Sequence, residues 1–158
     1  MVYLKDEGST FDAPIEFVWK YLFGGDAHDA AHHTTRQPSF QKVSEITFEY
    51  ASERLLRGQW KPDRMRISMF PPLSVVSEWL EGVLEGSKMA YLYAPLGERT
   101  RIDVYGEFTS TTLDSTEIEA TVREFLDSEF RDDEAVIRRE WAKSKGRRGG
   151  ASDPVTDG

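Results

Sequence analysis

The last third of the chain carries one unbroken helical pattern, and a helix of this length restricts what the rest of the chain can build. Apolar residues recur at helical spacing between residues 118 and 141, and no helix-breaking residue appears before Gly146. At 1.5 Å per residue, about 28 residues give a helix of roughly 40 Å. A helix with one apolar face must be covered by an apolar surface from elsewhere in the chain. The apolar positions are Ile118, Val122, Phe125, Leu126, Phe130, Ile137 and Trp141.

Side-chain chemistry indicates where this helix begins and where it changes direction. Thr116 and Glu119 have the spacing of a capping box, and Asp114 or Ser115 can serve as the cap instead. The acidic residues 132–134 interrupt the apolar stripe, which predicts a bend at that point.

A run of strands and turns precedes the helix, over residues 39–111. Apolar and polar residues alternate through most of it, for example over residues 65–69 and 102–108. This period of two predicts strands with one buried and one wet face. Proline and glycine mark the turns between them, and Pro62 with Asp63 is predicted to form one such turn.

The N-terminal part predicts one more strand and two short helices. Val2–Phe11 reads as a strand, and the period then changes. Asp12 can cap a helix and Pro14 suits its first turn, so a helix is predicted over residues 15–22. A second short helix is predicted over about residues 27–33.

These elements predict an α+β domain in which a curved antiparallel sheet of six to seven strands is wrapped around the long C-terminal helix, with two short helices after the first strand. Residues 1–145 are expected to form this single domain, and residues 146–158 a disordered tail. A sheet of this size must twist and curl. A curled sheet meets a straight helix at its ends and leaves room in the middle, so a cavity is expected between them.

Two segments resemble a known superfamily. Residues 11–22 (FDAPIEFVWKYL) are similar to the opening of the START-like (SRPBCC) helix-grip superfamily, which includes proteins labelled polyketide cyclase/dehydrase. Residues 100–108 (TRIDVYGEF), followed by the long helix, resemble its last strand and last helix. The resemblance implies the helix-grip fold with a hydrophobic ligand cavity. It does not imply one activity, because the superfamily includes carriers, receptors, cyclases and chaperone activators.

Composition excludes several partners. The net charge of −8 argues against affinity for nucleic acid or anionic membranes, and no segment approaches the roughly 20 apolar residues of a membrane span. The absence of cysteine excludes disulfide and thiol chemistry. No basic and apolar leader opens the chain, so a cytoplasmic location is expected. The protein is also expected to be a monomer or homodimer and to hold neither cofactor nor metal.

The expected ligand is a small lipid-, isoprenoid- or aromatic-like molecule held in the cavity. Aromatic side chains are more often ordinary core than ligand contacts, but many inward-facing positions converge on one space, and methionine suits an adaptable apolar pocket. The residues expected to line it are Trp19, His32, Arg36, Phe48, Trp60, Met65, Ile67, Met69, Tyr91, Ile102, Val104, Phe108, Phe125 and Leu126.

All histidines of the chain, His28, His32 and His33, lie in one short segment. On a helix, His28 and His32 share a face at a spacing that can chelate a transition metal, but two histidines do not complete a zinc site and no third ligand is evident. The favoured interpretation is therefore a polar, partly exposed helix rim. As alternatives, His32 or His33 acts as an acid or base, or one of them with Arg36 binds a carboxylate, phenol or phosphate at the cavity mouth.

Three functions remain open. The first is binding of a small hydrophobic molecule. The second is a cyclase- or dehydratase-like enzyme with His32, His33 or a tyrosine as the proton-transfer group. The third is a chaperone-activator-like interaction module that uses a surface near Trp141 or residues 132–134.

Overall fold

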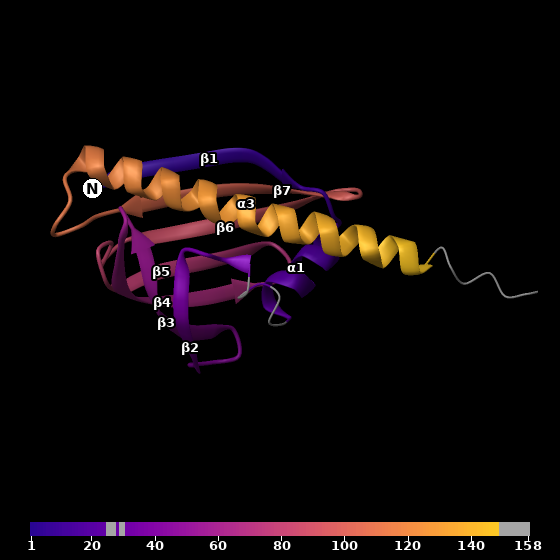
Figure 1. Ribbon diagram of the computed structural model, residues 1–158, viewed down its shortest axis with the longest axis horizontal. Coiled ribbons are helices and arrows are strands. Elements are labelled where there is room, and N and C mark those ends of the chain that lie inside the picture. Colours follow the sequence, from indigo (N-terminus) through magenta and orange to yellow (C-terminus); the bar gives the residue numbers. More distant parts are fainter. Residues whose placement is uncertain (25–27, 29–30, 149–158) are drawn as a thin grey trace, which may run out of the picture.

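The computed structural model describes residues 1–24, 28 and 31–148. One sheet of seven antiparallel strands, in the order β1-β7-β6-β5-β4-β3-β2, lies under a single long helix, α3 (Figure 1). The elements are β1 (Val2–Phe11), α1 (Ile15–Phe23), β2 (Thr35–Lys42), β3 (Thr47–Leu56), β4 (Gln59–Phe70), β5 (Ser74–Glu81), β6 (Lys88–Leu96), β7 (Arg99–Phe108) and α3 (Ser115–Arg148). The curved antiparallel sheet and the long C-terminal helix predicted from the sequence are confirmed.

The alternation of apolar residues determines which face of the sheet meets the helix. In β7, Ile102, Val104 and Phe108 are buried, whereas the intervening Arg101 and Tyr105 are exposed. Successive side chains of a strand point to opposite faces, so the apolar residues of every second position share the inner face.

The helix α3 is longer than predicted, and its cap is Asp114, the alternative two positions before Thr116. Asp114 accepts a hydrogen bond from the backbone N–H of Glu117 (2.9 Å), and the Glu117 carboxylate accepts one from the N–H of Asp114 (3.1 Å). This reciprocal pair is the capping box, not Thr116 with Glu119. The helix runs for 34 residues, through Gly146, so the first three residues of the expected tail are helical. Among the described residues, no helix is long and apolar enough to cross a membrane.

The helix packs tightly near both of its ends. Ile118 and Val122 are buried near the N-terminal end, where the helix runs along β1 (Figure 1). Towards the other end, Ile137 is fully buried and the Trp141 ring lies 5.0 Å from the ring of Phe17 on α1. Between these ends, the ring of Phe130 stacks on that of Phe11 at the end of β1, with ring centres 5.2 Å apart.

Two strand predictions were wrong. Pro62 and Asp63 lie inside β4 and form no turn. Proline is tolerated there because β5 pairs with β4 only from Arg64 onward, so β4 has a partner on one side at Pro62. The edge strand β2 was not predicted, because its residues are mostly exposed and show no alternation of buried and exposed positions.

The short helices match the prediction only in part. The helix α1 covers the predicted residues, but Asp12 does not cap it: the carbonyl of Pro14 accepts from the N–H groups of Phe17 and Val18 instead. Residues 27, 29 and 30 of the second predicted helix lie outside the described residues; of its other residues, His28 and Ala31 are helical, whereas His32 and His33 are not.

Candidate functional site

A cavity of about 550 Å³ lies between the inner face of the sheet and the middle of α3. Phe23 and Phe40 line it and are partly exposed to solvent, so the cavity opens beside them. Its apolar wall includes Met65, Ile67, Met69, Val75, Met89, Tyr91, Ile102, Val104, Phe125 and Leu126. The volume is within the range of small-molecule sites, and the space expected from the sequence is therefore present.

Most residues expected from the sequence to form this site lie around the cavity. Their inward direction follows from strand alternation in β3, β4, β6 and β7 and from the apolar stripe of α3. The residues of the expected set that line the cavity are His32, Phe48, Met65, Ile67, Met69, Tyr91, Ile102, Val104, Phe125 and Leu126.

The other four residues of that set do not line the cavity. Trp19 is buried in the core and its indole N–H donates to the carbonyl of Pro72 (2.6 Å). Phe108 is also core, beyond the cavity wall, with an exposed fraction of 1%.

Arg36 and Trp60 pair with each other. The Arg36 guanidinium lies 4.2 Å from the centre of the Trp60 ring, and its Nε donates to Glu53 (2.6 Å). Arg36 does not line the cavity and its partly exposed side chain is already paired with Glu53, so the binding of an anionic group by Arg36 stays a prediction.

The three histidines have different environments. The His33 side chain is 79% exposed and its Nε2 contacts Asp132 (2.8 Å), and the His28 side chain is 26% exposed, so both fit the partly exposed rim that the sequence predicts. The His32 side chain is 10% exposed and lines the cavity together with His28.

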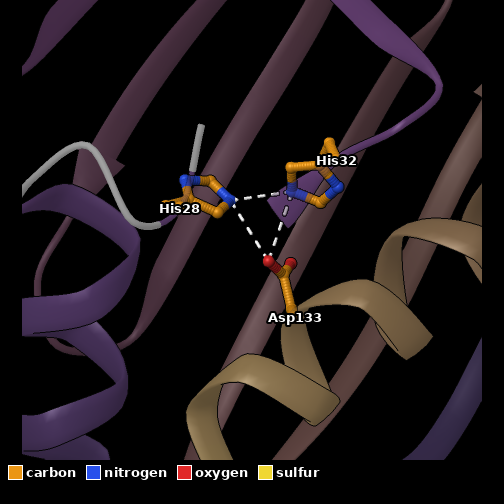
Figure 2. A group of neighbouring side chains, drawn as sticks. All are labelled: His28, His32 and Asp133. Atoms are coloured by element: carbon orange, nitrogen blue, oxygen red, sulfur yellow. Dashed lines mark hydrogen bonds and ion pairs between the residues drawn. The ribbon is translucent and has the colours of Figure 1, made fainter. Parts of the chain in front are cut away.

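His28 and His32 meet a carboxylate from the far end of the sequence. Their Nε2 atoms lie 3.1 Å apart, and Oδ1 of Asp133 on α3 lies 3.4 Å from His28 Nε2 and 3.2 Å from His32 Nε2 (Figure 2). Burial lowers the pKa of His32, but Asp133, Glu129 and Asp132 outweigh it and raise that pKa to about 9. The group of side chains therefore attracts a cation, either a proton or another positive species.

A buried arginine forms the other polar part of the wall. The guanidinium of Arg54 donates to Asp63 (3.0 Å), Glu129 (3.0 Å) and the sulfur of Met65 (3.4 Å), and it lies 4.5 Å from the centre of the Phe125 ring. Burial disfavours its charge, but the carboxylates of Glu129 and Asp63 outweigh burial and raise the pKa of Arg54. Arg54 thus stays charged and holds Glu129 in place.

Buried tyrosines supply further hydrogen-bond donors. Burial raises the pKa of both Tyr91 and Tyr93 above the ordinary value, and nearby carboxylates add to this effect. Burial, and secondly the charge of Asp133, also raise the pKa of Tyr21, whose hydroxyl donates to Asp133 (3.3 Å). These phenols stay protonated at neutral pH.

The sequence did carry a signal for the polar residues that were missed. Arg54 is on the same strand parity as Phe48 and Tyr50, so alternation alone places it on the inner face. Glu129 and Asp133 fall at helical spacing between Leu126 and Ile137. Asp133 therefore interrupts the apolar stripe because it faces the cavity, and the expected bend is not needed to explain it.

Comparison with known proteins supports the fold. No family model and no curated protein matches the sequence. Among solved structures, the Zhui aromatase/cyclase from Streptomyces sp. R1128 superposes with a TM-score of 0.73 at 15% identity, covering 96% of this chain and 100% of that chain.

Two further structures agree with this comparison. A START superfamily protein from Mycobacterium smegmatis has a TM-score of 0.74 at 10% identity, covering 87% of this chain and 97% of its own. The protein TTHA0849 from Thermus thermophilus has a TM-score of 0.76 at 12% identity, covering 88% of this chain and 99% of its own. The chain therefore has the START-like helix-grip fold that the sequence resemblance implied. Identities this low establish the fold alone.

Proposed function

We propose that the protein binds a small hydrophobic molecule in the cavity between the sheet and α3. The observation that carries this proposal is the unfilled space of about 550 Å³ whose wall is largely apolar. Protein interiors normally pack to the density of organic crystals, so a space of this size under a well-packed helix is unusual for a purely structural core. Cavities of this volume and lining are typical of small-molecule sites.

The lining restricts the ligand. Met65, Met69 and Met89 give the wall flexible, polarisable side chains that adapt to irregular apolar shapes. The polar part of the wall contains Glu129 and Asp133, and Arg54, which contacts Glu129, also pairs with Asp63. A carboxylate or phosphate ligand would meet repulsion there, so the ligand has an apolar body with an uncharged or cationic polar group.

The enzyme alternative requires a histidine in the cavity wall, and His32 meets this requirement whereas His33 does not. The interaction-module alternative keeps only part of its expected surface, since Glu134 and Trp141 are partly exposed. Asp132 and Asp133 are largely buried, and Trp141 packs on Phe17.

A fluorescence titration with a neutral apolar probe such as Nile red tests the binding function. The wild-type protein is expected to give saturable binding at one site per chain. Ile67→Trp, which points a larger side chain into the cavity, is expected to weaken binding at least tenfold. Leu92→Trp provides the matched control, because Leu92 is exposed on the neighbouring part of the sheet and does not line the cavity. Equal probe affinity in a folded Ile67→Trp variant and in the wild type would refute the cavity as the binding site.

A further inference from the structure

We propose that His28, His32 and Asp133 form a binding site for one divalent transition-metal ion on the wall of the cavity. The three side chains come from the segment after α1 and from the middle of α3, and their ligand atoms point toward one another (Figure 2). All three residues also line the cavity.

The distances between the ligand atoms fit a common ion. The edges of the triangle formed by the two Nε2 atoms and Oδ1 measure 3.1, 3.4 and 3.2 Å. Ligands roughly 2.1 Å from one metal ion, at angles between about 90° and 110°, lie roughly 3.0 to 3.4 Å from each other. The side chains therefore already have the spacing that a metal ion requires.

Hydrogen bonds alone satisfy this triangle poorly. A proton on the Nε2 of both rings, whether a ring is neutral or charged, leaves two N–H groups of His28 and His32 facing each other at 3.1 Å. With a proton on one Nε2 only, the lone pair of the other ring faces the carboxylate of Asp133. An ion at the centre accepts a lone pair from all three atoms at once.

Outer contacts support the same arrangement. Nδ1 of His32 and Oδ2 of Asp132 are both buried without a hydrogen-bond partner among the described residues, and they lie 3.7 Å apart. When Nε2 of His32 binds a metal, Nδ1 carries the proton and points at this carboxylate. A small movement of the two side chains towards each other then forms a hydrogen bond. Carboxylates and hydroxyls in such outer positions commonly orient metal ligands. The Tyr21 hydroxyl, which donates to Asp133, occupies a second such position.

The ligand set indicates the class of metal. Two imidazoles and one carboxylate suit Zn²⁺ and other divalent first-row metals better than Mg²⁺ or Ca²⁺, which prefer oxygen ligands. Three protein ligands leave at least one coordination position open, as in catalytic zinc sites. That position faces the cavity, so the ion contacts an oxygen of the bound molecule, such as a phenol, enol or carbonyl. This last step rests on the proposed function, whereas the metal site itself does not.

Titration with Zn²⁺ in the presence of a chromophoric chelator, after removal of bound metal with EDTA, tests the site. The full-length wild-type protein is expected to bind one equivalent, and His28→Ala and His32→Ala are expected to lose saturable binding. Asp132→Asn is expected to weaken binding about 10- to 100-fold, the usual effect of removing an outer partner. Circular dichroism establishes that each variant is folded.

Two matched controls place the ion. His33→Ala removes the exposed histidine of the same segment, and Asp127→Asn removes an exposed carboxylate of α3; both are expected to retain one equivalent. Absence of saturable Zn²⁺ binding in the folded wild type overturns the proposal, and so does one retained equivalent in a His28→Ala, His32→Ala double variant. Nile red binding measured on the same samples separates the two proposals. Probe binding without metal binding refutes the metal site alone, and metal binding without probe binding refutes the binding function alone.

Discussion

Replacing Arg54 tests whether the polar wall of the cavity is a fully paired network. Arg54→Met keeps an unbranched side chain of similar length but removes the guanidinium. Asp63 then loses its partner, and its side chain is only 3% exposed. Glu129 also loses a partner, but its side chain is 22% exposed and regains some solvation. Removing one member of a buried ion pair costs about 3 to 5 kcal/mol, and most of that loss is expected from Asp63.

Urea unfolding followed by tryptophan fluorescence measures this loss as a change in the free energy of unfolding. Arg64→Met is the matched control, because Arg64 also contacts two carboxylates, Glu49 at 2.8 Å and Glu81 at 2.6 Å, but lies on the wet face of the sheet. The loss of free energy of unfolding in Arg64→Met is expected to be much smaller, since exposed ion pairs contribute little to stability.

A second variant and a change of pH test the cause. Asp63→Asn added to Arg54→Met removes the unpaired charge, so the double variant is expected to be more stable than Arg54→Met. Burial already raises the pKa of Asp63, and without the guanidinium that pKa rises further. A carboxyl with a raised folded-state pKa binds its proton more readily in the folded state. The difference in the free energy of unfolding between Arg54→Met and the wild type is therefore expected to decrease as the pH falls below neutral. A loss for Arg54→Met no larger than that of Arg64→Met, or a double variant less stable than Arg54→Met, would refute the reasoning.

Three further predictions concern the scaffold. Asp114→Ala removes the side-chain cap of α3 and is expected to lower the free energy of unfolding by about 0.5 to 2 kcal/mol in urea denaturation; an unchanged midpoint would contradict the cap. Gly106→Ala places a methyl group against the buried ring of Phe108 and is expected to cost about 1 to 3 kcal/mol in the same assay. The N–H of Gly8 donates to Asp103 and, as the largest cause, lowers its pKa. Carboxyl NMR should therefore give Asp103 a titration midpoint below the ordinary value, and its contribution to stability is lost as the pH falls through that midpoint.

Local patterns were sufficient to predict most of the scaffold. The period of two in β4 and β7 and the apolar stripe of α3 each follow from burying one face, so they are visible in the sequence. Strand β2 shows no such pattern because it is an exposed edge strand. The turn predicted at Pro62 was wrong. A strand tolerates proline where one neighbouring strand does not pair with it, and that depends on how the whole sheet is paired.

The candidate site was less accessible to sequence reasoning. Alternation alone could have placed Arg54 and Asp63 on the inner face, because both share the parity of buried neighbours in β3 and β4. That they pair with each other follows from the register, which sets Arg54 opposite Lys61 and so brings it near Asp63. The meeting of His28 and Asp133 could not be deduced, because it depends on how α3 crosses the sheet.

The path of α3 explains why the cavity and its polar residues occur together. The helix packs through Val122 near one end, through Phe130 onto Phe11 of β1, and through Ile137 and Trp141 towards the other end, and the cavity lies where it does not touch the sheet. Some inner-face positions of the helix that line this cavity are therefore free from the demand for apolar packing. Glu129 and Asp133 occupy them, where leucine would bury apolar area without the desolvation penalty of a carboxylate. Acidic residues at these positions cost stability, as expected if the cavity has the binding role proposed above, and the path of the helix accounts for both the cavity and the carboxylates in its wall.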